Sequence, residues 1–152
     1  MELKLRVEDY RKIERRLEDL RAKFIQELNV VDTYFNQPRG KVLKIEQGER
    51  GNFISRLEAH KGRFKIIESK KVKNIEKEKR HLKEKFGIKA ILKKKRRQWE
   101  LGDTLFDFNL IENVGDFLIL NSENPHKSTV TDLLGIKNPG YITVSFDELK
   151  KK

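Results

Sequence analysis

The residues with the clearest chemical meaning form a run of cations between positions 89 and 97. Six lysines and arginines stand in this run without a single acid. Clustered ammonium and guanidinium groups bind phosphate oxygens through charge-assisted hydrogen bonds. If the run is a strand, alternate residues share a face, so Lys94, Arg96 and Gln98 would oppose Lys93, Lys95, Arg97 and Trp99. The run therefore predicts an anion-binding strand with cations on both faces.

A second charged pattern opens the chain. Leu3, Leu5 and Val7 alternate with Glu2, Lys4 and Arg6, which is the period of a strand with one apolar and one charged face. The charged face is either an ordinary solvated edge or part of a polar interior.

The composition favours anionic partners. The 152 residues carry a formal net charge of +11 and a pI near 9.8, with 39% charged side chains. Nucleic acid, nucleotides, polyphosphate or an anionic membrane surface would suit this charge. A thermophile-like composition rich in surface ion pairs is the alternative explanation.

Several classes of protein are disfavoured. The chain has no cysteine, so disulfides and thiolate metal sites are excluded, and three histidines do not suggest a histidine-rich metal site. No segment has the roughly 18–20 apolar residues that span a bilayer, and no apolar signal segment opens the chain. We therefore expect a soluble cytoplasmic protein without membrane insertion.

The periodicities predict an antiparallel α+β protein. The expected strands cover residues 2–7, 28–35, 41–47, 52–58, 63–68, three segments within 89–121, and 141–146. The expected helices run from about 7 to 26, from the Asn74 cap to Gly87, and from Pro125 through Leu134. No linker divides the chain, so we expect one domain over residues 1–152. Cations opposite apolar faces suggest a sheet curled around a polar channel with helices outside, whereas an open sheet with one wet face is the alternative.

The order of these elements resembles a known family. The ELKLRV start, VDTYF, the KKKRRQW strand and NLIENVGDFL together resemble the CYTH superfamily of triphosphate tunnel enzymes, and most closely its short archaeal members that are similar to class IV cyclases. The family includes class IV adenylyl cyclases, thiamine triphosphatases and inorganic triphosphatases. The resemblance covers nearly the whole chain and is best at residues 1–46 and 87–121. It implies an eight-stranded antiparallel tunnel in which inward cations hold phosphates and inward carboxylates hold Mg²⁺ or Mn²⁺.

The resemblance also implies which side chains form the site. The phosphate-binding set would be Lys4, Arg6, Lys44, Lys94 and Arg96, with Arg56 beside the place of a further lysine, at Leu57. Glu2 and Glu68 are what remains of the metal-binding set. Glu46 stands where the family has an arginine, and Asn109 and Asn121 stand where it has acids. One or two acids would not readily hold two metals.

Three functional hypotheses follow. The first is a basic barrel cavity that binds a nucleoside triphosphate, tripolyphosphate or a similar anion, with catalysis weakened or lost. The second is an active Mg²⁺- or Mn²⁺-dependent triphosphatase or adenylyl cyclase, whose catalytic residues the sequence does not identify. The third is a basic nucleic-acid-binding protein that uses residues 89–97 and 150–152. A monomer or a homodimer fits each of them.

Overall fold

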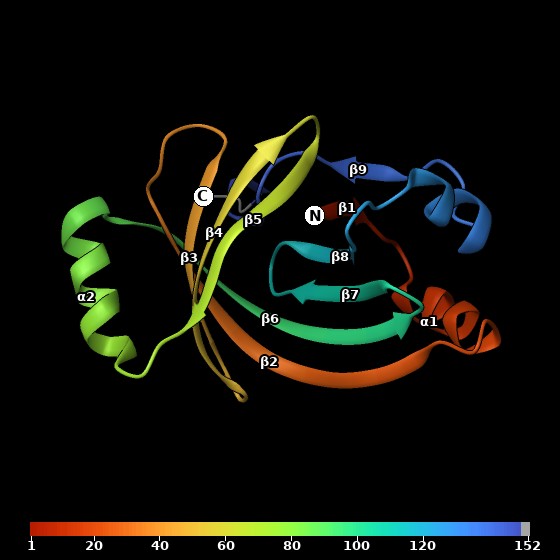
Figure 1. Ribbon diagram of the computed structural model, residues 1–152, viewed down its shortest axis with the longest axis horizontal. Helices are drawn as coiled ribbons and strands as arrows, with labels where there is room; N and C mark the ends of the chain where they lie inside the picture. Colours follow the sequence, from red (N-terminus) through yellow and green to blue (C-terminus); the bar gives the residue numbers. More distant parts are fainter. Residues whose placement is uncertain (150–152) are drawn as a thin grey trace.

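The chain folds into an antiparallel sheet that closes on itself (Figure 1). The computed structural model describes residues 1–149. The strands are β1 (Glu2–Arg6), β2 (Lys23–Phe35), β3 (Lys41–Gly48), β4 (Gly51–His60), β5 (Arg63–Lys71), β6 (Ile88–Leu101), β7 (Thr104–Ile111) and β8 (Gly115–Asn121). They follow the order β5-β4-β3-β2-β6-β7-β8-β1, and the pairing of Glu2 with Phe64 joins β1 back to β5. This confirms the predicted eight-stranded antiparallel barrel.

A ninth strand completes the edge where the barrel closes. β9 (Gly140–Ile142) pairs antiparallel with Lys4, Leu5 and Arg6 of β1. β5 pairs with the same strand only at Glu2. The segment after β8 is therefore part of the barrel wall.

Helices cover the outside of the barrel on two sides. α1 (Tyr10–Asp19) and the π-helical turn η1 (Thr129–Leu133) pack on the outer faces of β1 and β6–β8. α2 (Ile75–Phe86) packs beside β2, β3 and β4, at the opposite side of the molecule in Figure 1. The Asp9 and Asn74 side chains cap α1 and α2 by accepting hydrogen bonds from backbone amides of their first turns.

The sheet has its main apolar cores outside the barrel. Leu3 and Leu5 of β1 point outward and pack with Ile13 and Leu17 of α1. Leu43 and Ile45 of β3 point outward beneath α2 in the same way. Because side chains alternate along a strand, burying these residues under helices turns their charged neighbours into the barrel.

The predicted first helix was too long. α1 ends at Asp19, Arg21 adopts a positive φ of 64°, and β2 starts at Lys23, where it pairs with Glu100 of β6. Phe24, which continued the helical spacing, instead lies on β2 with its ring 5.2 Å from that of Trp99. The backbone hydrogen bonds of a long strand pair outweigh the local helical pattern here.

The predicted last strand was also too long. β9 ends at Ile142, and residues 146–149 form α3 (Phe146–Leu149). Phe146 is 3% exposed and packs on Phe117, at a ring distance of 4.8 Å, inside the barrel. Continuing the strand would deny Phe146 this burial.

Candidate functional site

The inward side chains enclose a cavity of ≈ 260 Å³ within the barrel. Its charged lining consists of four cations and three acids: Lys4, Lys44, Lys94, Arg96, Glu2, Glu46 and Asp107. Its polar neutral lining includes Ser55, Ser69, Asn109, Asn121 and Ser145. Its apolar lining includes Val42, Phe53, Leu57, Phe64, Ile66, Ile119 and Phe146.

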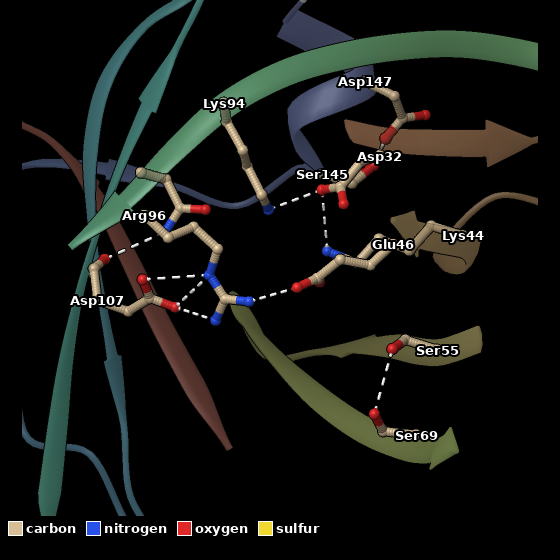
Figure 2. Close-up of polar contacts among 11 residues, drawn as sticks. Asp32, Lys44, Glu46, Ser55, Ser69, Lys94, Arg96, Asp107, Ser145 and Asp147 are labelled. Atoms are coloured by element: carbon tan, nitrogen blue, oxygen red, sulfur yellow. Dashed lines mark hydrogen bonds and ion pairs between the residues drawn. The ribbon is translucent and has the colours of Figure 1, made fainter. Parts of the chain in front are cut away.

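Asp32 of β2 is a buried anion shared by two lysines. Its Oδ2 lies 2.7 Å from Lys94 Nζ and 3.4 Å from Lys44 Nζ (Figure 2). The Asp32 side chain is fully excluded from solvent. Burial opposes its charge, but the two lysines outweigh burial and hold the pKa of Asp32 below its ordinary value. Burial likewise opposes the charge of Lys44, but Asp32 together with Tyr34, Glu46 and Glu2 outweighs it, so the pKa of Lys44 is raised.

Arg96 of β6 lies between two acids. Its guanidinium binds both carboxylate oxygens of Asp107, and its Nη1 donates to Glu46 Oε1 at 2.5 Å (Figure 2). Burial opposes the charge of Arg96, but Asp107 and Glu46 outweigh it and raise the pKa of Arg96. Burial also opposes the charge of Glu46, and Lys94 and Arg96 reverse this so that the pKa of Glu46 is lowered. Each of the three guanidinium nitrogens of Arg96 therefore already donates to a protein carboxylate.

Lys4 differs from the other cavity cations, because it forms no ion pair with a carboxylate of residues 1–149. Its ammonium lies over two aromatic rings, 3.8 Å from the centroid of Phe64 and 4.5 Å from that of Phe146. Burial lowers the pKa of Lys4 to about 7, and nearby Glu2 offsets only part of this. Lys4 is therefore the cavity cation most available to a ligand.

The charges inside the barrel balance. Lys4, Lys44, Lys94 and Arg96 are matched by Glu2, Glu46, Asp107 and the adjoining Asp32. The net charge of +11 therefore lies on the rest of the chain rather than in the cavity. The basic cavity predicted from the sequence is corrected in this respect, because inward acids on β1, β2, β3 and β7 offset the cations.

The donor set does not fit a metal ion as it stands. Residues 1–149 contain no group of three or more histidines, cysteines, aspartates or glutamates placed to hold one. Asp32, Glu46 and Asp107 are each bound to a cation. Mg²⁺ would have to compete with these cations for its oxygen ligands.

One buried acceptor in the cavity is left without a donor. Asn109 is fully buried, and its Nδ2 donates to the Asp107 carbonyl. No donor of residues 1–149 reaches its Oδ1. Asn109 lies opposite Arg96 in the β6–β7 register, two residues after Asp107 on the same strand.

The structure brings together five of the eight residues that the sequence singled out. Glu2, Lys4, Lys44, Lys94 and Arg96 line the cavity. Arg6 is not among the lining residues: it is exposed, and its guanidinium lies over the Phe117 ring. Arg56 and Glu68 pair with each other at 3.6 Å, and their side chains are 45% and 41% exposed. They are not among the cavity-lining residues, so the binding roles predicted for them gain no support from their positions.

Sequence reasoning missed the acids of the site. Asp107 was not among the site residues predicted from the sequence, and it lines the cavity. Asp32 carried a signal in the sequence, because it is an isolated acid between the apolar residues of VDTYF. An acid at such a position needs a buried cation as its partner.

The outer face of β6 holds the remaining cations of the run. Lys93 and Lys95 are exposed, and Lys89 binds Asp147 at 2.8 Å and also Glu148 of α3. Lys150–Lys152, the other part of the predicted nucleic-acid surface, lie outside the described residues. Within residues 1–149, no helix has the length and apolar character needed to cross a membrane.

Comparisons with known proteins agree with this architecture. The model of the CYTH domain matches residues 1–147. A protein of Pyrococcus horikoshii has 26% identity and a TM-score of 0.88, with 99% of each chain covered. A conserved hypothetical protein of Pyrococcus furiosus has 24% identity and a TM-score of 0.84, covering 97% of this chain and 98% of that one.

A more distant structure shares the fold alone. A Hippeastrum protein, described as revealing a dominant triphosphatase activity, has 11% identity and a TM-score of 0.59, covering 88% of this chain and 83% of that one. No curated protein matches the sequence.

Proposed function

Because the chain belongs to the CYTH domain family, we propose that its barrel binds a small phosphate-bearing ligand and that turnover of this ligand is weak or absent. The ligand phosphate would be held by Lys4, Lys44 and Lys94. The observation that carries the proposal is the convergence of these three lysines on one part of the barrel cavity.

The three ammonium groups are close enough to act together. Lys4 and Lys94 both lie over the Phe146 ring, 4.5 Å and 5.9 Å from its centroid. Lys44 and Lys94 share Asp32, so one carboxylate faces two cations. A phosphate here would accept charge-assisted hydrogen bonds from a surplus of donors.

Weak turnover follows from how the other groups are engaged. The charge of Arg96 is already offset by Asp107 and Glu46, so Arg96 has less to contribute to charge that develops in a transition state. The acids that could hold a metal are bound to cations in the same way. Cations that hold the ground state and transition state equally well give binding without acceleration.

Calorimetric titration tests this proposal. Phosphate, tripolyphosphate and ATP would be titrated with and without Mg²⁺ or Mn²⁺, and phosphate release would be measured on the same samples. We expect binding that does not require the metal and little release. The Lys94→Met variant should lose binding, whereas Lys93→Met, the outward neighbour on the same strand, should bind like the unmodified protein. Equal binding by both variants would contradict a phosphate site inside the barrel.

An active metal-dependent enzyme is the second candidate. Glu2, Glu46 and Asp107 do line the cavity, and a ligand phosphate that displaced Glu46 and Asp107 from Arg96 would free oxygen ligands. Metal-dependent phosphate release at ordinary enzymatic rates would favour this candidate over binding alone.

The exposed cations on the outer face of β6 support a third candidate, nucleic-acid binding. Lys93 and Lys95 form no ion pair with residues 1–149 and adjoin the groove that contains Asn29 and Val31. Such binding would fall steeply with salt and would be lost in a Lys93→Met, Lys95→Met variant. The affinity for a ligand in the barrel cavity should be unaffected by these two substitutions on the outer face.

A further inference from the structure

We propose that the ligand is an organic phosphate ester whose neutral organic group lies against the inner faces of β4 and β5 and leaves the barrel past Ile66. This inference rests on the proposed function, because it names the ligand class and a specificity-determining residue for the same cavity. It leaves the number of phosphate groups on the ligand open. The distribution of charged and neutral side chains around the cavity leads to it.

The charged lining of the cavity comes from four strands. Within residues 1–149, every charged side chain that lines it belongs to β1, β3, β6 or β7. β4 and β5 contribute six of the described lining residues, all of them neutral: Phe53, Ser55, Leu57, Phe64, Ile66 and Ser69. The two serines are Cα partners, and their hydroxyl oxygens lie 3.3 Å apart (Figure 2). One wall of the cavity is therefore neutral and mostly apolar.

This neutral wall begins beside the proposed phosphate site. Lys4 Nζ lies 3.8 Å from the centroid of the Phe64 ring on β5. Ile66 is two residues further along the same strand and shares its inner face with Phe64, because alternate side chains of a strand point to the same side. Leu57, the Cα partner of Ile66 on β4, also lines the cavity. A group attached to a phosphate at Lys4 would therefore lie against these apolar side chains.

The cavity reaches solvent beside the free edge of β5. β1 pairs with β5 only at Glu2 and Phe64, so residues 65–71 have β4 as their only neighbouring strand within residues 1–149. Ile66 and Ser69 line the cavity, yet Ile66 is 38% exposed and Ser69 is exposed as well. Side chains that line a cavity and are also reached by solvent stand at its opening. An organic group too large for the ≈ 260 Å³ inside the barrel can therefore extend past Ile66.

Apolar surface on the ligand is what this wall would recognise. An organic group that covers Ile66 and its apolar neighbours removes their surface from water, which is favourable. A chain of inorganic phosphates gains nothing from the wall, because a charged group loses hydration against apolar side chains. An ester keeps its phosphates at the lysines and places its organic group on β4 and β5. We therefore expect the site to favour organic esters over inorganic phosphates of the same length.

Three triphosphate esters test the proposal by calorimetry, each with and without Mg²⁺. Methyl triphosphate has the smallest organic group, whereas phenyl triphosphate and ATP carry the same triphosphate on a large one. We expect the better of phenyl triphosphate and ATP to bind about tenfold more tightly than methyl triphosphate, the effect of removing roughly 55 Å² of apolar surface from water. In Ile66→Ser this advantage should fall to about threefold or less, because the organic group loses apolar contact. Methyl triphosphate should bind this variant as before.

Ile67→Ser is the matched control on the same strand. Ile67 is 48% exposed, close to the exposure of Ile66, and is not among the cavity-lining residues. The register shift of the β4–β5 hairpin leaves Ile67 between two paired positions, so the same substitution there changes no cavity contact. This variant should keep the advantage of the organic group.

Two kinds of failure can be told apart. Equal binding of the three esters by the unmodified protein would overturn the proposal without any variant. An advantage that survives in a folded Ile66→Ser protein, or that disappears equally in Ile67→Ser, would also overturn it. If none of the three esters binds and tripolyphosphate does not bind either, the proposed phosphate site itself fails, which is a separate result.

Discussion

Asp32 Oδ2 lies 2.7 Å from Lys94 Nζ, and the two side chains are 0% and 2% exposed. This ion pair is shielded from solvent. It joins β2 to β6, the two longest strands of the barrel. Lys44 reaches the same carboxylate oxygen from β3. One aspartate thus joins three strands and offsets part of the charge of Lys44 and Lys94.

The first prediction concerns the stability that this aspartate provides. Asp32→Asn leaves Lys44 and Lys94 buried without the carboxylate that pairs with them, and breaking a buried ion pair typically costs about 3–5 kcal/mol. Chemical denaturation would measure the loss in the free energy of unfolding. Glu68→Gln, which breaks an exposed pair, should change it by about 1 kcal/mol or less. A similar small effect for Asp32→Asn would show that the buried pair is not structurally important.

The second prediction concerns the pH dependence of folding. Burial lowers the pKa of Lys4 to about 7 from its ordinary 10.5. Between these values the unfolded chain binds the proton and the folded chain releases it, so stability from this group rises with pH. The slope reaches at most about 1.4 kcal/mol per pH unit. Denaturation at pH 7 and pH 9 should show this rise for the unmodified protein relative to Lys4→Met. Parallel pH profiles would contradict the burial of a neutral Lys4.

The third prediction concerns proton uptake on binding. A phosphate beside Lys4 favours its ammonium form, so the pKa of Lys4 should rise in the complex. At pH 8, binding should therefore take up as much as about one proton. Calorimetry in buffers with different ionisation enthalpies measures this uptake. The uptake from Lys4 should shrink at pH 6, where Lys4 is already protonated in the free protein. Phosphate binding without uptake at pH 8 would place the phosphate away from Lys4.

The fourth prediction concerns the aromatic wall of the cavity. Phe146→Ala removes a buried ring that packs on Phe117 and lies against Lys4. The lost burial of the ring and the void that the substitution leaves in the core should together destabilise the protein by about 3–5 kcal/mol. Val144→Ala, at a 42% exposed position two residues earlier, should change stability by about 0.5 kcal/mol or less. Thermal and chemical denaturation would compare the two. Equal effects would mean that the last segment does not complete the core.

The fifth prediction concerns the attachment of α1 to the barrel. Glu14 Oε2 accepts from Trp99 Nε1 at 2.6 Å and from Arg97 Nε at 2.8 Å. Glu14→Leu would leave the buried indole N–H without an acceptor, which costs about 1–3 kcal/mol. The exposed Glu18 on the same helix provides the control as Glu18→Leu. A loss no larger than that of the control would show that the Trp99 hydrogen bond is not needed to dock the helix.

The amino-acid sequence determined the barrel class and most of its strands. Alternation in residues such as Leu3, Lys4 and Leu5 fixes two faces of a strand, because side chains point to opposite sides at every step. The match of charged faces on several strands then predicted a polar interior. Lys4, Lys44, Lys94 and Arg96 could be placed inside from this pattern and from the family resemblance.

Tertiary structure alone decided the charge of that interior. Alternation does not say which acids meet which cations, and a register shift between Arg56 and Leu57 changes the pairing within the β4–β5 hairpin. The pairing of β2 with β6 over Lys23–Phe35 ended α1 early and brought Asp32 beside Lys94. The turn after β9 brought Phe146 beneath Lys4. These contacts join residues far apart in the chain, and their electrostatic effect depends on distance and burial, which exist only once the barrel has closed.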